Sequence, residues 1–385
     1  MSSRRRLRKA RGYTRGATPS LALTASLARL SDLNDDGDNK LIIADMNKKL
    51  KIYKGTNVIF TETLSDMPVA VETFYDSTSK PTIPFIAIAA GSSIYYYHKY
   101  RAHFKYDLPE VELSPEELQV WSKLKNNLVS VADAMEELNT IRETKELSSQ
   151  SNEALALETH EEQEAFVRER KDKPIRQVNY VTCMSRMQKN LDDEKAVTML
   201  VVGTEQRHLI IMEHVVGKIK KTVRMPSVPV FLDITGQFDI DYKAYVACRD
   251  GKVYVVKNSE VGQLSYDIET KPVGLVRIDK TIVVGGMNNT FYSFFAKGKK
   301  NFSVFLPAAI TNMDKLEITR TQNVRAVLVA IANGEVRLYN DMYLITTIKC
   351  DDIVTGMAFG VFGREEGSLV LNFKSGGLTV KILQR

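Results

Sequence analysis

The sequence predicts an all-β protein, a seven-bladed β-propeller with a helical insertion between blades two and three. The main observation is a repeat. A β-rich apolar run, a turn with Gly, Asp or Asn, and a second β-rich run occur seven times. The repeats start about 37 to 45 residues apart, which is the length of a four-stranded blade, except for one gap of about 114. A single Trp and no Gly-His…Trp-Asp pair exclude the commonest propeller signature.

The seven hairpins define the middle strands of the blades. Their first strands are expected at residues 41–45, 85–90, 199–203, 244–248, 281–285, 326–331 and 368–373. Their second strands are expected at 50–53, 94–98, 208–212, 252–256, 290–295, 335–339 and 378–383. Turns such as Asp250-Gly251 and Asn333-Gly334 supply residues that tolerate a positive φ at little cost.

Flanking strands complete the blades on either side. Preceding strands are expected at residues 69–74, 178–184, 228–234, 273–278 and 353–359, and following ones at 219–225, 302–306 and 343–350. Residues 21–30 are expected to form the innermost strand of blade one. The seventh blade has only three strands before residue 385. Residues 17–23 complete it if the ring closes by strand exchange. Otherwise the fourth strand lies beyond residue 385, or the blade has three strands.

The insertion begins with a strong helix start. In Ser114-Pro115-Glu116-Glu117 the serine can cap, proline suits the first helical position, and Glu117 can close a capping box. Apolar residues then recur at spacings of three and four and predict one helical face: Leu118, Trp121, Leu124, Leu128, Val131, Met135, Leu138 and Ile141. A polar loop is expected at 143–152 and a further helix at 153–170, which makes two or three helices.

Two roles are open for the insertion. Its apolar face either packs on the side of the propeller or, with Trp121, Leu124 and Leu128, docks a partner. The expected domains are a basic disordered tail (1–17), blades one and two (18–112), the insertion (113–173) and blades three to seven (174–385).

The positive charge is concentrated in the tail. The whole chain carries 53 basic and 47 acidic residues, a net charge of +6. The first fifteen residues include Arg4, Arg5, Arg6, Arg8 and Lys9 and no acidic residue. Solvated disorder, contact with an anionic membrane, nuclear localisation with nucleic-acid contact, and an organelle presequence are open. Slight aromatic interleaving argues against nucleic acid.

The residues that carry catalytic or metal chemistry are sparse. The three cysteines are widely spaced, which indicates a reducing compartment and no disulfide framework or zinc site. None of the five histidines stands in a metal-ligand spacing, and no serine-hydrolase or phosphate-loop motif occurs. No apolar run approaches the length of a membrane span. We therefore expect a non-catalytic interaction platform without metal or cofactor.

One loop offers an alternative. Asp32, Asn34, Asp36 and Gly37 begin like a calcium loop, but Lys40 stands where a carboxylate is wanted. An acidic turn capped by its own hydrogen bonds is the favoured interpretation. The alternatives are a calcium-binding propeller enzyme, or a scaffold that binds polyanions through its tail.

From about residue 19 to its end, the chain resembles the amino-terminal propeller of the Bardet–Biedl syndrome protein one family, insertion included. The segments that carry the resemblance are 141–144, 189–194, 200–205, 226–232, 236–239, 271–276, 307–310, 332–337, 363–365 and 376–378. Family members continue into a coiled coil and an ear-like β domain, so the chain is expected to represent the propeller alone. The Arg-rich tail is not a hallmark of the family.

The resemblance implies a binding function. The family provides a subunit of the BBSome, a ciliary cargo-adaptor coat, whose propeller binds a GTP-loaded Arf-like small GTPase through blades one and seven. That GTPase recruits the coat to membrane, and the propeller contributes to sorting ciliary membrane proteins. The implied partners are this GTPase, other BBSome subunits and cargo. The implied location is the cytoplasm, the cilium and its basal body.

Blade geometry supports the same pair of blades independently. Residues 31–40 and 360–367 both join a first strand to a second, so they are expected on one face of adjacent blades. The candidate GTPase-binding residues are Asp35, Asp36, Lys54, Phe362, Arg364 and Glu365. Phe362 is expected to be an apolar anchor and Arg364 a charge partner, although a salt bridge from Arg364 to the acidic turn is an alternative. Leu371 is expected in the core.

Overall fold

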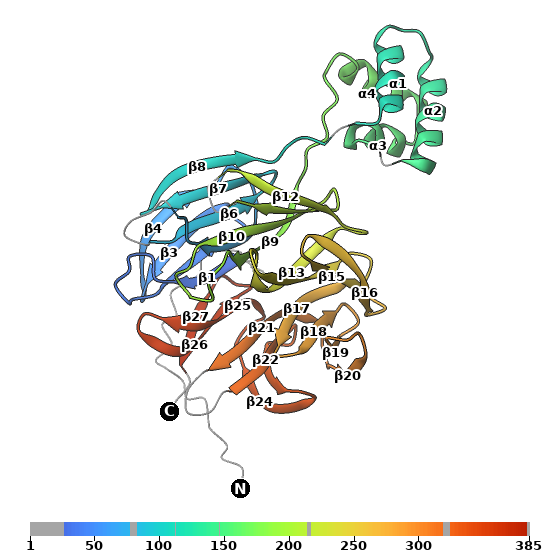
Figure 1. The fold of residues 1–385 in the computed structure, drawn as a ribbon. Coiled ribbons are helices and arrows are strands. Elements are labelled where there is room, and N and C mark those ends of the chain that lie inside the picture. The colour runs from blue at the N-terminus through green and yellow to red at the C-terminus, as the bar shows by residue number, and fades with distance from the viewer. Residues whose placement is uncertain are drawn as a thin grey trace. The chain divides into compact units, whose positions relative to one another are not determined.

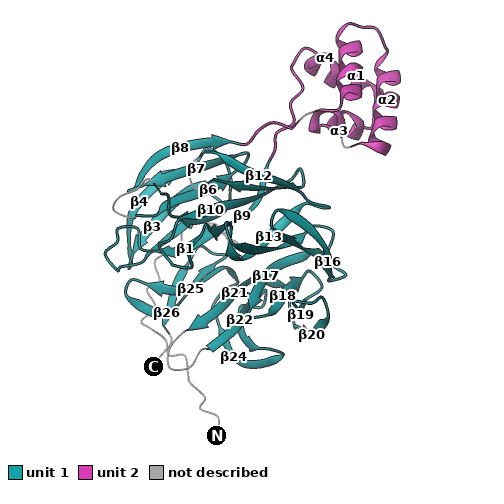
Figure 2. Ribbon diagram, in the orientation of Figure 1, with its two compact units in different colours: residues 1–107, 180–385 teal, residues 108–179 magenta. Residues whose placement is uncertain are grey.

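The structure, a computed structural model, describes residues 27–77, 83–111, 113–145, 147–213, 217–318 and 324–382. The chain forms two compact units, residues 1–107 with 180–385 and residues 108–179 (Figure 2). The described part of the first unit is built from strands, and that of the second from four helices.

The strands of the first unit follow one another as antiparallel meanders, here numbered as blades one to seven (Figure 1). Blade one holds β1 (Ala28–Ser31), β2 (Lys40–Ala44), β3 (Lys49–Lys54) and β4 (Asn57–Thr63). Blade two holds β5 (Pro68–Phe74), β6 (Phe85–Ala90), β7 (Ser93–His98) and β8 (Arg101–Asp107). Blade three holds β9 (Val181–Gln188), β10 (Thr198–Thr204), β11 (His208–Met212) and β12 (Ile219–Arg224).

The later blades repeat this order. Blade four holds β13 (Pro229–Gln237), β14 (Asp241–Cys248), β15 (Lys252–Lys257) and β16 (Glu260–Asp267). Blade five holds β17 (Pro272–Ile278), β18 (Thr281–Gly286), β19 (Thr290–Phe295) and β20 (Lys300–Phe305). Blade six holds β21 (Ile310–Ile318), β22 (Val324–Ile331), β23 (Glu335–Asn340) and β24 (Tyr343–Lys349). Blade seven holds β25 (Val354–Phe362), β26 (Glu365–Phe373) and β27 (Leu378–Ile382).

The first strands of the blades form a closed ring. Each of β1, β5, β9, β13, β17 and β21 contacts the first strand of the next blade, and β25 contacts β1. Blades three and four are also joined by one parallel pair, Gln188 with Gln237. This arrangement makes the first unit a β-propeller, in which the ring covers the inner sheet edges.

Burial follows position within a blade. Every residue of β2, β6 and β10 is buried, whereas β4 is almost entirely exposed. The cores lie between blades: one cluster joins residues of blades one, two and seven, including Leu41, Val71 and Val370. Apolar residues on both faces of the middle strands are therefore what the packing of neighbouring blades requires.

The hairpins expected from sequence are present, and β6, β11 and β19 have the predicted bounds. The pattern did not single out β4, β8, β16 or β21. Of these, β4, β8 and β16 are outer strands with mostly exposed residues, so they carry little apolar signal. The strand expected from residue 21 begins in the described region at Ala28. The possible closing strand at 17–23 and the basic tail lie outside the described residues.

The helical unit differs from the predicted pattern. It contains α1 (Pro115–Lys125), α2 (Val131–Thr144), α3 (Ser149–Ala156) and α4 (His160–Arg170). The single apolar face expected from Leu118 to Ile141 is wrong, because the chain turns after α1 with Asn127 at φ +53°. The loop expected at 143–152 is wrong too, because Ser148 caps α3 there.

The capping box expected at Ser114 is also absent. Ser114 makes no side-chain cap hydrogen bond. The Glu117 side chain is fully buried and instead accepts hydrogen bonds from Ser148 N at 3.0 Å and from Ser148 Oγ and Ser151 Oγ at 2.5 Å. Trp121 Nε1 donates to Ser151 Oγ at 2.8 Å. Glu117 thus ties α1 to the start of α3, where a carboxylate is favoured by the free N–H groups.

Candidate functional site

Two loops from the first and last blades meet on one face of the propeller. Asn39 N donates to Gly363 O and Gly363 N donates to Asn39 O, both at 2.8 Å. Gly360, at the start of the second loop, also lies close to Leu30 of β1, since a Cβ on Gly360 would be 3.3 Å from Leu30 Cδ1. The loops of residues 31–40 and 360–367, here called the seam loops, are therefore joined by backbone hydrogen bonds.

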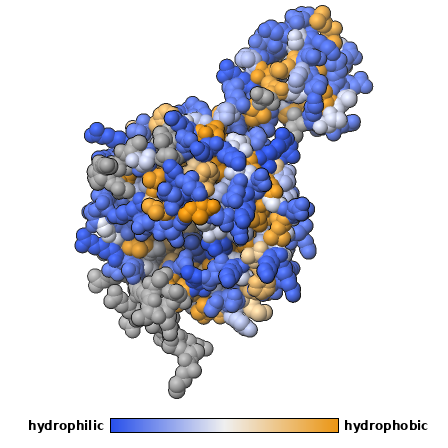
Figure 3. Space-filling view, viewed as in Figure 1, coloured by the Kyte–Doolittle hydropathy of each residue, from blue (hydrophilic) through white to orange (hydrophobic). Residues whose placement is uncertain are grey.

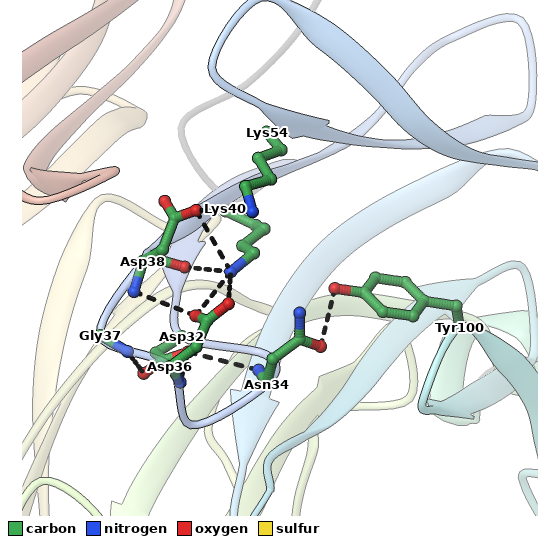
Figure 4. A network of polar contacts seen from close by, with 8 residues as sticks. All are labelled: Asp32, Asn34, Asp36, Gly37, Asp38, Lys40, Lys54 and Tyr100. Carbon is green, nitrogen blue, oxygen red and sulfur yellow. Dashed lines mark hydrogen bonds and ion pairs between the residues drawn. The ribbon is translucent and has the colours of Figure 1, made fainter.

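The loop of blade one is organised by its own aspartates (Figure 4). Asp32 accepts hydrogen bonds from the backbone N–H of Asn34 at 3.3 Å, Asp36 at 3.2 Å and Gly37 at 2.7 Å. Asp36 Oδ1 accepts another from Asp38 N at 3.0 Å. These bonds hold the backbone in a tight turn without an external ligand.

Lys40 is the centre of this loop. Its side chain is fully buried, and Nζ donates to Asp36 Oδ1 at 2.8 Å, Asp36 Oδ2 at 3.0 Å and the Asp38 carbonyl at 2.5 Å. The hydrogen bond from Lys40 holds the pKa of Asp36 well below its usual range. Burial disfavours the charged ammonium, but the hydrogen bond to Asp36 and the charge of Asp38 leave the pKa of Lys40 raised. The buried cation is thus matched by carboxylates.

Neighbouring blades support the same loop. Tyr100, in the β7–β8 turn, donates from Oη to Asn34 Oδ1 at 3.0 Å. Lys195, in the β9–β10 loop, forms an ion pair with Asp35. Lys54 Nζ lies 3.2 Å from Asp38 Oδ2. Asp35, Asp36 and Lys54 were among the residues predicted from the sequence. Tyr100 and Lys195 were not, because they come from blades two and three and carry no motif.

The second seam loop presents the residues expected to contact a partner. Phe362 is half-buried and packs against the core cluster of blades one, two and seven. Arg364 and Glu365 are exposed. Arg364 forms no ion pair with any other residue in the described part of the chain, so the alternative salt bridge to the acidic turn is not formed. Its guanidinium group is available to a partner.

The calcium alternative requires space and uncompensated charge between the loop carboxylates. Lys40 Nζ already contacts Asp36 and lies 3.7 Å from Asp38 Oδ2. An ammonium group in this position neutralises the carboxylates that a divalent ion would need. In the described ranges, no group of three His, Cys, Asp or Glu side chains is arranged to hold a metal ion. The loop residues therefore do not fit calcium.

Two of the cysteines are buried in the described part of the propeller. Burial raises the pKa of the Cys183 thiol to about 12 and also raises that of Cys248. Both thiols therefore stay protonated and unreactive at neutral pH. No helix within the described ranges combines the length and apolar character needed to cross a bilayer.

The three candidate residues of the insertion do not share one exposed surface. Trp121 and Leu124 are each 3% exposed and pack against α2, α3 and α4. Leu128 is 72% exposed because it lies in the turn between α1 and α2. The first two stabilise the helical unit itself, since its core takes up the apolar side of α1.

The ring and the seam loops define the class of protein: a β-propeller whose candidate site is formed by polar surface loops. The family model described as "Ciliary BBSome complex subunit 1" matches residues 14–257. The chain belongs to this family.

Curated relatives and solved structures agree with that assignment. "BBSome complex member BBS1" of Mus musculus is 38% identical over 369 residues, covering 94% of this chain and 62% of the relative. The Homo sapiens protein of that description is 38% identical over 364 residues, covering 92% and 61%. The chain thus spans about three fifths of their length.

Two crystal structures of BBS1N in complex with ARL6DN, one soaked with lead and one with mercury, are similar in fold. Both have a TM-score of 0.76 and 31% sequence identity. The first match covers 95% of this chain and 94% of the other. The second covers 97% of both chains.

Proposed function

We propose that this chain is a non-catalytic interaction platform of the BBSome that binds a GTP-loaded Arf-like small GTPase. Family membership and the similarity to BBS1N, solved in complex with ARL6DN, support this function. Recruitment to membrane, contacts with other BBSome subunits, sorting of ciliary membrane cargo and location at the cilium belong to the same proposal.

The observation that carries the choice of site is the bridge between Asn39 and Gly363. It makes one surface of the two seam loops, with Lys54 beside them. Phe362 offers a partly buried apolar ring next to the exposed charges of Arg364 and Glu365. An apolar centre with an arginine at its edge is a composition enriched at protein interfaces.

Nucleotide dependence would arise from the partner. A small GTPase changes the conformation of its switch segments between the GTP and GDP states. The first seam loop is tied to blades two and three by Tyr100 and Lys195, and to the second seam loop by the backbone bridge of Asn39 and Gly363, so together they offer a fixed surface. A fixed surface that fits one state gives the difference in affinity on which recruitment depends.

Titration calorimetry with the cognate Arf-like GTPase tests the proposal. We expect binding with the GTP analogue and none with GDP. Arg364→Glu is expected to weaken binding by about 100-fold or more, because it places a negative charge at a charge-complementary contact. Lys374→Glu, an exposed reversal in the β26–β27 turn, is the matched control and should bind normally. Normal binding by Arg364→Glu would show that the GTPase contacts another surface of the chain. Absence of binding in both the GTP and the GDP state would contradict the proposed function.

A further inference from the structure

The outer strands of blades two and three carry an unusual concentration of exposed positive charge. β8 and β12 and the turn before β12 contribute six exposed cations, here called the basic rim: Arg101, Lys105, Lys218, Lys220, Lys221 and Arg224. Two carboxylates in these segments offset them, with Asp107 2.8 Å from Lys105 and Glu213 3.6 Å from Lys220. Six cations against two carboxylates leave an excess of four positive charges.

The two flanking blades differ from blades two and three in this respect. β4 of blade one and β16 of blade four occupy the equivalent outer position, and neither contains a basic residue. β16 instead begins with Glu260 and ends with Asp267. An exposed edge strand needs some charge to avoid pairing with other chains, but either sign would serve. Protection of the edge strands therefore does not explain why the outer strands of two adjacent blades carry mainly positive charge.

Apolar side chains lie among these cations. Phe104 on β8 is 45% exposed and Ile219 on β12 is 37% exposed. Gly217, two residues before β12, lies against the Phe104 ring of β8, since a Cβ on Gly217 would be 2.5 Å from Phe104 Cε1. Figure 1 shows β8 and β12 at the same border of the propeller. On the surface shown in Figure 3, hydrophilic side chains predominate and hydrophobic ones form small groups.

The basic rim is continuous with the face that holds the seam loops. Tyr100, whose Oη bonds Asn34 of the first seam loop, directly precedes Arg101. Because the strands of a blade alternate in direction, the starts of the fourth strands β8 and β12 lie on the same side of the propeller as the seam loops. A flat partner that lies against the rim would also lie beside the proposed GTPase site.

We propose that the basic rim is a contact surface for the headgroups of an anionic lipid bilayer. Clustered Lys and Arg side chains lower the free energy of a protein near anionic lipid, and each adds to the attraction. Aromatic and aliphatic side chains between the cations suit the interface between headgroups and acyl chains. The rim is formed by outer strands, so it can meet an extended surface. This contact is separate from GTPase binding and does not require it.

Vesicle flotation of the full chain, without any GTPase, tests the proposal. The chain is expected to float with phosphatidylcholine vesicles that contain phosphatidylserine, less so at raised salt, and not with phosphatidylcholine alone. Lys220→Glu with Lys221→Glu should lower the partition coefficient at least about ten-fold. Both side chains are exposed, so the thermal unfolding temperature should stay close to that of the original chain.

Two further variants separate the effect of the rim from that of net charge and from that of the basic tail. Lys271→Glu with Lys374→Glu gives the same change in net charge at exposed positions outside the rim and should float as the original chain does. Arg4→Glu, Arg5→Glu and Arg6→Glu alter the basic tail, and the effect of the rim variant should persist in that background.

Several results would overturn the proposal. One is an equal loss of flotation in the rim variant and in the control variant. Another is a loss of flotation that the tail substitutions alone explain, and a third is equal flotation with neutral and with anionic vesicles. Binding to polyglutamate in solution without flotation would assign the rim to an acidic polypeptide instead. Calorimetry with the GTPase is an independent readout, since the rim variant leaves the seam loops unchanged.

Discussion

At the scale of single residues, Lys40 decides the character of the first seam loop. Its ammonium group contacts both oxygens of Asp36 and a backbone carbonyl while fully removed from solvent. Sequence reasoning identified Lys40 as a cation that opposes metal binding. It did not reveal that the side chain points inward, because direction depends on the fold of the turn around it.

Lys40→Met tests this role. The substitution keeps most of the buried volume but removes the cation that contacts Asp36 and leaves Asp38 with Lys54 alone. We expect a loss of about 2 kcal/mol in the free energy of unfolding, below the range for fully buried pairs because Asp36 is partly exposed. Urea denaturation measures the loss. Lys54→Met, which removes a more exposed partner of Asp38, should cost less.

Calcium should not stabilise the first seam loop. The chain is expected to show the same thermal unfolding temperature with calcium and with a chelator, because the ammonium group of Lys40 already lies between Asp36 and Asp38. A calcium-dependent rise that disappears in Asp36→Ala would contradict this and restore the calcium alternative.

Asp314 on β21 supports the junction of blades six, seven and one. Its Oδ2 accepts from Phe359 N at 2.9 Å and its Oδ1 from Lys315 N at 2.8 Å. Burial raises the pKa of Asp314 to about 6, despite these bonds and the nearby charges of Arg29 and Lys315.

The raised pKa of Asp314 determines how its contribution to the free energy of unfolding changes with pH. Protonation is easier in the folded state, so the contribution of Asp314 is fully present below the ordinary pKa of an aspartate and is lost as pH rises through about 6. Asp314→Asn should therefore flatten the decline in stability between roughly pH 4 and 6. Urea denaturation across that range gives the comparison. An unchanged slope would show that Asp314 titrates normally.

At the scale of elements, the hairpin strands were predictable and the helices less so. Strands such as β6 and β10 are buried throughout, and such short apolar runs between turn residues are a strong signal. In the insertion, the apolar spacing continued through a turn. Asn126 and Asn127 were the available signal, because asparagine tolerates the left-handed conformation that ends a helix. The buried Glu117 could not be predicted, since its partners lie about thirty residues away.

Glu117→Ala tests what holds the helical unit together. The change leaves Ser148 and Ser151 without their buried acceptor and removes one of the links between α1 and α3, while the hydrogen bond from Trp121 to Ser151 remains. We expect a loss of about 3 kcal/mol within this unit. Hydrogen exchange followed by mass spectrometry should show faster exchange in α1 to α4. Exchange in the middle strands of the propeller should be unchanged, and Glu116→Ala, which alters an exposed ion pair, is the control.

At the scale of the whole molecule, the ring makes the last blade a structural neighbour of the first. Leu371 is fully buried between blades six and seven, as expected from sequence. The repeat length predicted which blades are adjacent, and adjacency predicted that the seam loops would lie together. The sequence did not indicate the backbone bridge or the basic rim. The bridge depends on loop conformation, and the rim combines exposed residues of two blades.

Leu371→Arg tests the ring as a cooperative unit. An unpaired charge at this position is expected to cost more than about 4 kcal/mol and to unfold the ring rather than blade seven alone. Calorimetry should show either no folded protein or one unfolding transition at a much lower temperature. Val58→Arg on the exposed strand β4 is the matched control and should unfold almost normally.

A partner bound across the bridge between Asn39 and Gly363 should stabilise the closed ring. The two ends of the ring meet at this bridge, so a ligand resting on both seam loops acts as a clamp across the closure. Opening the ring would then require the ligand to leave, which adds RT ln(1 + [L]/Kd) to the free energy of unfolding. By the same linkage, substitutions that loosen the closure far from the loops weaken binding in proportion to the fraction of molecules whose ring they open. A partner that clamps the ring therefore protects it most in variants whose ring opens most readily.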